Sequence, residues 1–375
     1  MAENRNRGMT LPEQQFFALL RVGLWSEPLD ISLFSGKTNW NGLLKLGEKQ
    51  TVLGVLGDGI GQLPPELRPS REQLRWLQGR LLQIRQHHLL LNHTLEEVNG
   101  RLCAAGVHPI LLKGQGVARY YRYPEQRQCG DIDLYVKPEK YATACEALRE
   151  YGQQTGEEHE SLLHYHFNRN GVTIELHRKA SYVPDPFIDK RLQTILNTYL
   201  CGQDFEKSKT DVLLPPANFD TFFLFQHFIR HFLQEGVGLR QICDWTLCLH
   251  VHKEKIDRER LLIEIRQTGM THCWEIFGLI AVDYLGLPKD EFPGFSSKQK
   301  DEAKRVVDII LDAGNFGHYV KVNTPRPKEY YKGKWHAFKK WIRWRLKVLF
   351  IASWLLIRWN FFSFLYSMKV ALLHR

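Results

Sequence analysis

Two aspartates inside an apolar run place the tightest limit on how this chain folds. In "GDIDLYV", residues 130–136, Asp131 and Asp133 alternate with Ile, Leu and Val. This period of two predicts a β-strand with one face on a hydrophobic core and both carboxylates on the other face. Like charges on one face of a strand repel each other, so we expect opposite charge to lie against this face.

A second strand carries a similar polar face further along the chain. In "VTIELH", residues 172–177, Glu175 and His177 alternate with apolar residues, and the Asn-Gly pair directly before them predicts a hairpin turn. If the two strands are neighbours, Glu175 joins the two aspartates. Three converging carboxylates favour Mg²⁺ or Mn²⁺. Two alternatives stay open: the aspartates face solvent on an edge strand, and Glu175 pairs with a basic neighbour.

The segment "LLKGQG" lies upstream of the first strand. Lys113 ends an apolar strand expected over residues 107–113, and Gly114 opens the turn into a short helix. Glycine lets the backbone approach a phosphate, and a helix N-terminus supplies free N–H groups. An ordinary strand-to-helix turn uses the same residues. The order of strand, glycine turn, helix and Asp-x-Asp strand therefore carries more weight than either residue alone.

The periodicities along the rest of the chain predict an α+β fold, with a mixed sheet flanked by helices. A long amphipathic helix is expected after Ser70, and the pattern becomes helical throughout from Pro215. We expect four parts: an N-terminal helical segment (1–69), a sheet-containing domain (70–214), a helical domain (215–325) and a basic-aromatic tail (326–375).

Taken together, these motifs resemble the uncharacterised nucleotidyltransferase family often found among bacterial polysaccharide and capsule loci, within the DNA polymerase β-like superfamily. The matching residues are Leu112-Lys113-Gly114, Arg127, Asp131-Ile132-Asp133-Leu134, Glu175-Leu176-His177, His227, His231, Asp244-Trp245 and "GNFG" at 314–317. One departure is Gln115, because the wider superfamily usually has Gly or Ser after the turn glycine.

The resemblance implies a nucleotidyltransferase-fold sheet and transfer of an NMP from an NTP. The acceptor would be a hydroxyl or phosphate of a small or glycan-related molecule. Asp131 and Asp133 would hold Mg²⁺ (or Mn²⁺), and Glu175 would complete a second metal site or act as a general base. The implied nucleotide- and acceptor-binding residues are Lys113, Gly114, Arg127 and His177. The alternative is a catalytically inactive nucleotide-binding or interaction protein of the same fold.

Three further polar residues stand in the helical half of the chain. The spacing of His227 and His231 places both on one helix face. The pair could bind zinc or have a hydrogen-bonded role, and the hydrogen-bonded role is favoured. Asp244 lies in the apolar run "ICDWTLCL" and needs a partner if buried. We expect that partner to be one of the histidines or Arg240, and a nucleotide-facing role is the alternative.

The basic tail is rich in Trp, Phe, Lys and Arg. Lys347, Arg358 and Lys369 are 11 residues apart, which predicts one basic helical face. The tail could pack on the protein's own core, lie on an anionic membrane, or cross a membrane at a tilt that tolerates Arg358. The net charge of +10 suits an anionic partner. Because the basic residues are mixed with aromatic ones, lipid is favoured over nucleic acid.

Two further features concern the cellular compartment. The seven cysteines are scattered without a C-x-x-C pair, and the polar N-terminus lacks the apolar core of a signal peptide. We expect reduced thiols and a cytoplasmic protein, peripheral at the inner face of the membrane if the tail binds lipid.

Overall fold

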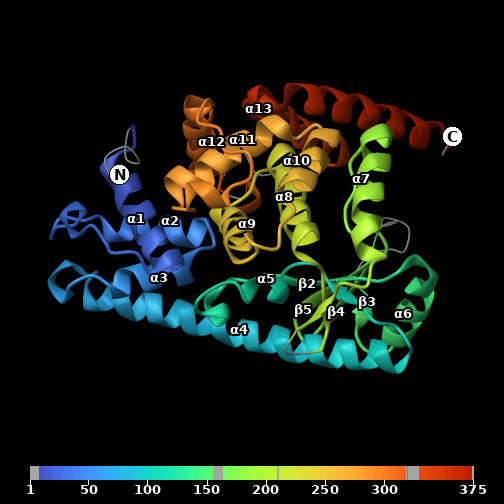
Figure 1. The fold of residues 1–375 in the computed structure, drawn as a ribbon, viewed down its shortest axis with the longest axis horizontal. Helices are drawn as coiled ribbons and strands as arrows, with labels where there is room; N and C mark the ends of the chain where they lie inside the picture. Colours follow the sequence, from blue (N-terminus) through green and yellow to red (C-terminus); the bar gives the residue numbers. More distant parts are fainter. Residues whose placement is uncertain (1–7, 155–163, 209–210, 318, 320–328, 374–375) are drawn as a thin grey trace.

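The structure is a computed structural model that describes residues 8–154, 164–208, 211–317, 319 and 329–373. Within these residues the chain forms the predicted α+β fold, with a seven-stranded mixed sheet among helices (Figure 1). The elements are α1 (Leu11–Trp25), α2 (Trp40–Lys49), α3 (Leu53–Gly61), α4 (Arg71–Ala104), β1 (Ile110–Leu111), α5 (Gln115–Ala118), β2 (Asp131–Tyr135), α6 (Tyr141–Leu148), β3 (Gln153–Gln154), β4 (His164–Arg169), β5 (Val172–His177), α7 (Pro186–Leu200), β6 (Glu206–Lys207), β7 (Leu213–Leu214), α8 (Ala217–Gln234), α9 (Leu239–Val251), α10 (Arg258–Gln267), α11 (Thr271–Leu279), α12 (Lys300–Ala313) and α13 (Tyr330–Leu373).

The strand order is β3-β4-β5-β2-β1-β7-β6. β2 runs parallel to β5, whereas β1 is antiparallel to β2 and β4 is antiparallel to β5. The β4–β5 hairpin turns at Asn170 and Gly171, whose φ angles of 53° and 82° are those the Asn-Gly pair predicts. The strand expected over 107–113 is shorter, because only Ile110–Leu111 is paired and Pro109 has no N–H to donate.

Helix α4 covers one face of the sheet. Ile132 and Leu134 of β2 pack in one apolar cluster with Leu95 and Val98 of α4. Figure 1 shows α4 running along the underside of the strands. Ser70 caps this helix as predicted, because its side chain accepts a hydrogen bond from the Gln73 N–H.

A second and larger core joins the two ends of the chain. Helices α1–α3 pack with α8–α12, and Tyr135 from the other face of the sheet belongs to the same cluster. Gln50 links the two groups of helices, since its Nε2 donates to the Ile310 carbonyl at 2.9 Å and its Oε1 accepts from the Leu239 N–H at 3.1 Å. The change from strands to helices falls after β7, where it was expected. The division into four domains stays a prediction.

The C-terminal segment is not one continuous helix. Helix α13 is interrupted at Ala352, with φ −148° and ψ 47°, and Arg345 hydrogen-bonds Asn360 across the bend. The prediction of one basic face that includes Lys347 and Arg358 is therefore wrong. An 11-residue spacing aligns side chains only along an unbroken helix.

Candidate active site

The pairing of β2 with β5 brings the two polar strand faces together. Asp133 lies opposite Glu175, and Asp131 lies opposite Thr173. Both strands are interior to the sheet, so the alternative of an edge strand facing solvent is wrong. Asp133 is 1% exposed, whereas Asp131 is partly exposed.

Two cationic side chains lie among these carboxylates. Lys113 Nζ is 3.1 Å from Asp133 Oδ2 and 3.7 Å from Asp131 Oδ2. His177 Nε2 is 3.0 Å from Asp133 Oδ1 and 3.2 Å from Glu175 Oε2. Lys113 and His177 therefore supply the opposite charge that the strand pattern requires.

Burial and charge together set the protonation of this cluster. Burial disfavours the ionised form of Glu175, but hydrogen bonding and charge from His177, and then the charge of Lys113, outweigh it and lower the pKa of Glu175 to about 2. Burial also disfavours the charged forms of His177 and Lys113, yet the contacts with Asp133 and its neighbours leave both pKa values above their ordinary range. Glu175 is thus a carboxylate at neutral pH, and its surroundings favour the protonated form of His177. To act as a metal ligand, His177 would have to lose that proton.

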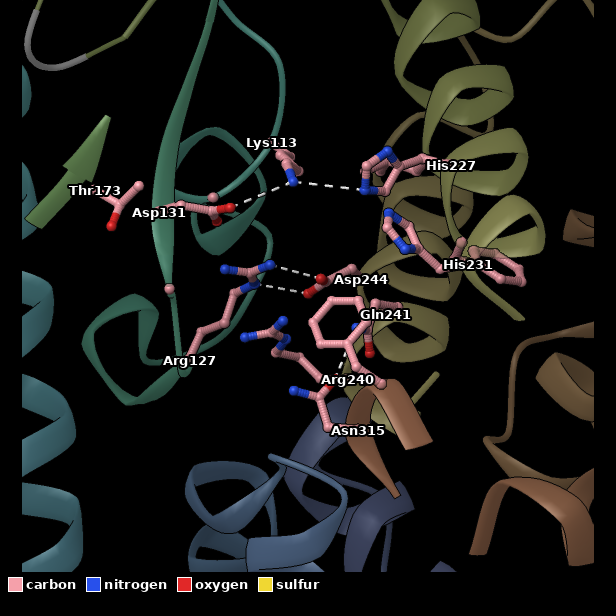
Figure 2. Close-up of a pocket in the computed structure, with 15 residues that line it drawn as sticks. Lys113, Arg127, Asp131, Thr173, His227, His231, Arg240, Gln241, Asp244 and Asn315 are labelled. Atoms are coloured by element: carbon pink, nitrogen blue, oxygen red, sulfur yellow. Dashed lines mark hydrogen bonds and ion pairs between the residues drawn. The ribbon is translucent and has the colours of Figure 1, made fainter. Parts of the chain in front are cut away.

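Asp133, Glu175 and His177 form a donor set that fits a divalent cation. One donor atom from each lies within 4.8 Å of the other two. The carboxylate oxygens suit Mg²⁺ or Mn²⁺, and the imidazole nitrogen suits a transition ion better than Mg²⁺. Asp131 is not a member of this set, and Figure 2 shows its carboxylate directed at Lys113. The family resemblance implies instead that Asp131 is a metal ligand and that His177 is a nucleotide- or acceptor-binding residue.

The glycine turn has the expected position and a conformation that requires glycine. Gly114 precedes α5 with φ 64° and ψ −117°, a region that side chains with a Cβ rarely adopt. A Cβ at this position would lie 3.2 Å from the Asp131 carbonyl oxygen. The turn therefore fixes Lys113 relative to β2.

A cleft between the sheet and helices α8–α9 contains two adjoining cavities. They share five residues: Lys113, Asp131, His227, His231 and Phe316. The arginine cavity, of about 320 Å³ and drawn in Figure 2, is also lined by Gly114, Arg127, Arg240, Gln241, Asp244 and Asn315. The carboxylate cavity, of about 240 Å³, is also lined by Asp133, Glu175, His177, Lys179, Tyr182 and Arg230. Together they have the size of a small-molecule site.

Arg127 and Asp244 form a buried ion pair across this cleft (Figure 2). Arg127 donates from Nε to Oδ1 at 2.7 Å and from Nη2 to Oδ2 at 2.6 Å, and the Tyr121 hydroxyl donates to Oδ1 at 2.7 Å. Burial opposes the charge of Arg127, but Asp244 holds its pKa well above the ordinary range. The partner of Asp244 is thus Arg127, rather than the expected Arg240 or histidine. Arg127 lines the arginine cavity, and its contact with phosphate stays a prediction.

His227 and His231 share one face of α8, as their spacing predicts. Their ring centroids are 4.7 Å apart. His227 Nε2 lies 3.5 Å from Lys113 Nζ, and His231 Nδ1 lies 2.7 Å from Glu235 Oε1. Burial, and then the charge of Lys113, hold the pKa of His227 well below its ordinary value, so the ring is neutral. Neither histidine belongs to a metal-ligand group in the described part of the chain, which agrees with the hydrogen-bonded role.

Several residues of the cleft are not found by sequence reasoning. Arg230 follows His227 by three residues on α8, so the helical period could have pointed to it. Lys179 and Ser181 come from the loop after β5, where no periodicity applies. Arg240 is expected from the sequence only as a partner of Asp244. It enters the arginine cavity from the first turn of α9, and its Nη1 donates to the carbonyl of Gln128.

A sequence comparison decides the family. The profile of a family described as uncharacterised nucleotidyltransferase matches residues 36–286. The chain belongs to this family. The matched range holds β2, β5 and the helices α8–α9 that face them. Of the cleft residues of this nucleotidyltransferase, Asn315 and Phe316 lie outside it. Searches of curated proteins and of solved structures found no match. The expected association with polysaccharide and capsule loci stays a prediction.

Proposed function

We propose that this nucleotidyltransferase moves an NMP from an NTP to a small acceptor, glycan-related as the resemblance implies, that carries an anionic group. The observation that carries the proposal is the register of β2 and β5. It sets Asp133 opposite Glu175, at the side of a cleft whose walls bear lysine and arginine. Phosphoryl transfer depends on positioning and on neutralising phosphate charge, and these residues supply both.

The arginine cavity is the place we propose for the triphosphate. Lys113 and the Gly114 turn line it together with Arg240. Arg240 Nε is buried and has no hydrogen-bond partner among the residues that the structure describes. A buried donor without a partner is costly, and a phosphate oxygen would satisfy it.

Asp133, Glu175 and His177 are the residues that would hold a divalent cation. Such an ion neutralises charge on the transferred phosphoryl group and orients the reacting oxygens. Of the two roles expected for Glu175, we propose that of ligand. A carboxylate with a pKa of about 2 is a weak proton acceptor near neutral pH.

The carboxylate cavity is the place we propose for the acceptor, and its far side is cationic. Arg230 stacks over the Tyr182 ring at 5.1 Å, and Lys179 lines the same cavity. The Ser181 hydroxyl and Arg230 Nε are buried without hydrogen-bond partners in the described residues. A phosphate or carboxylate on the acceptor matches this set of donors.

One observation favours the alternative of an inactive binder. Lys113 and His177 already compensate the charge of the carboxylates, so this cluster does not need a metal ion to offset its negative charge. The two functions differ in one measurable product, because a binder holds NTP and releases no pyrophosphate.

The test is pyrophosphate release from each NTP with Mg²⁺ or Mn²⁺, followed by label transfer to sugars with and without a phosphate. Asp133→Asn should abolish release, and the matched control Glu254→Gln, at an exposed carboxylate, should leave it unchanged. Arg230→Gln should weaken transfer to phosphate-bearing acceptors and leave NTP binding intact. NTP binding without release from any NTP supports the inactive binder instead. Equal release from the Asp133 variant overturns the assignment of the site.

A further inference from the structure

Helix α13 uses only one of its sides to hold the protein together. Six large apolar side chains on that side are buried in the second core: Trp344, Val348, Ile351, Leu355, Leu356 and Trp359. The Trp344 indole also donates to the Phe232 carbonyl at 2.8 Å. The tail therefore packs on the protein's own core, as one of the sequence alternatives states, but this packing leaves other large side chains of the helix exposed.

The outer side of α13 after the bend is an apolar stripe. Trp354, Ile357, Phe361, Phe364 and Leu365 follow helical spacing and are 43–62% exposed. Residues at this spacing lie along one line of a helix. Single exposed apolar residues are ordinary on a protein surface, whereas a continuous stripe of large ones marks an interaction surface.

The part of α13 before the bend adds positive charge to exposed aromatic side chains. Lys339, Lys340 and Arg343 are exposed, as are Trp335 and Phe338. Residues 330–373 contain nine Lys or Arg and no Asp or Glu, while the whole chain has a net charge of +10. The excess positive charge of this protein is therefore concentrated in its last helix.

We infer that the outer side of α13 docks on a lipid bilayer with anionic headgroups and lies in the plane of its interface. Apolar side chains would enter the acyl boundary while the neighbouring lysines and arginines contact the headgroups. Charge argues against a second copy of the chain as the occupant, because two such helices would repel each other. Docking of α13 is independent of nucleotidyl transfer.

A spanning helix agrees less well with the structure. By length and composition Phe338–Leu365 could cross a membrane, but 33% of its most apolar window is buried inside the protein. Arg358 is bound to Asp185, a fully buried residue that caps α7. Insertion would pull the six buried side chains out of the core and break this ion pair. In Figure 1, α13 lies on the side of the molecule away from the sheet, so a bilayer against it touches neither β2 nor β5.

Flotation of the full chain with vesicles tests the inference. We expect binding to vesicles with about one-quarter phosphatidylglycerol, and binding several-fold weaker both to pure phosphatidylcholine and in about 0.5 M NaCl. Ile357→Ser/Phe361→Ser should weaken partitioning about tenfold or more. Lys339→Gln/Lys340→Gln/Arg343→Gln should remove the preference for anionic lipid.

The matched control is Leu82→Ser/Leu89→Ser on α4, whose side chains are 55% and 56% exposed outside α13. It should bind like the wild type, and thermal unfolding should show that all variants fold. Equal binding of wild type and Ile357→Ser/Phe361→Ser would overturn the inference. Vesicle binding that resists alkaline carbonate would also overturn it, because such resistance identifies a spanning helix. A third contrary outcome is a protein that does not bind vesicles but self-associates, with the self-association abolished by Ile357→Ser/Phe361→Ser.

Discussion

At the scale of single residues, several buried charges of the cleft have oppositely charged neighbours. Asp133 has Lys113 and His177, and Arg127 has Asp244. A buried pair contributes little net stability compared with an apolar pair, but removal of one partner leaves the other charge buried and unpaired. The cost of a substitution therefore depends on which charge remains.

We expect Asp244→Ala to lower the free energy of unfolding by about 3–5 kcal/mol, because Arg127 would stay buried without its two hydrogen bonds. Chemical denaturation measures the change. The double variant Arg127→Met/Asp244→Leu removes both charges and fills the space with apolar atoms, so it should lose less than Asp244→Ala. A larger loss in the double variant would show that the pair is not the source of the effect.

A second polar group, outside the residues that line the cavities, sets a pH dependence. The Tyr120 hydroxyl donates to Asp220 Oδ2 at 2.8 Å and lies 2.8 Å from His252 Nε2. Burial raises the pKa of Asp220 from 3.8 to about 7, although Tyr120 and Arg119 oppose it. Because folding raises this pKa, the stability contributed by neutral Asp220 is complete below about pH 4 and is lost as pH rises through about 7.

Thermal unfolding between about pH 4 and pH 8 tests this dependence. The melting temperature of Asp220→Asn relative to the wild type should rise across this window, because the variant has no carboxyl group to ionise. The slope is the readout, since the amide also changes the hydrogen bond with Tyr120. Parallel curves for the two proteins would contradict a raised pKa at Asp220.

At the scale of elements, the glycine turn before α5 is a demanding piece of backbone at the candidate site. Gly114→Ala should destabilise the protein by about 1–3 kcal/mol, because φ 64° with ψ −117° is strained for alanine and its Cβ would meet the Asp131 carbonyl at 3.2 Å. Gly79→Ala is the matched control, in an exposed part of α4 with open space around it. It should stabilise by about 0.5–1 kcal/mol. Equal effects of the two substitutions would remove the special role of the turn.

Elements with a strong local period are the ones that sequence alone predicts. Alternation predicts the strands β2 and β5, the Asn-Gly pair predicts the hairpin of β4 with β5, and a Ser cap predicts the start of helix α4. The break at Ala352 does not, because it depends on packing against the core and on the ion pair between Arg358 and Asp185.

The same distinction holds for the candidate site. Each strand shows its own polar face in the sequence, so Lys113, Asp133 and Glu175 could be named from local pattern. The partner of Asp244 lies 117 residues away at Arg127, and the guanidinium of Arg240 reaches the cavity because α9 packs beside α5 and the segment before β2. Contacts of this kind are decided by tertiary packing, which no short-range period records.

At the scale of the whole molecule, α13 is part of the fold as well as an exposed surface. Burial of six large apolar side chains contributes on the order of 10 kcal/mol, which is comparable with the total stability of many proteins. Deletion of residues 330–375 should therefore leave the chain largely unfolded. Calorimetry and binding of a hydrophobic dye measure this, and an unchanged melting transition would contradict it. Point substitutions on the outer stripe are consequently the better way to separate lipid binding from folding.

The position of the cleft has a consequence for where the chain can be cut without loss of the site. One wall comes from the chain before Pro215, and the other comes from α8 and α9 after it. A gene fragment that ends at this proline keeps the carboxylates but loses His227, Arg230 and Arg240. The sheet and both helices must therefore stay together for the cleft to exist, and a break between them would separate the carboxylates from Arg230 and Arg240 in one step.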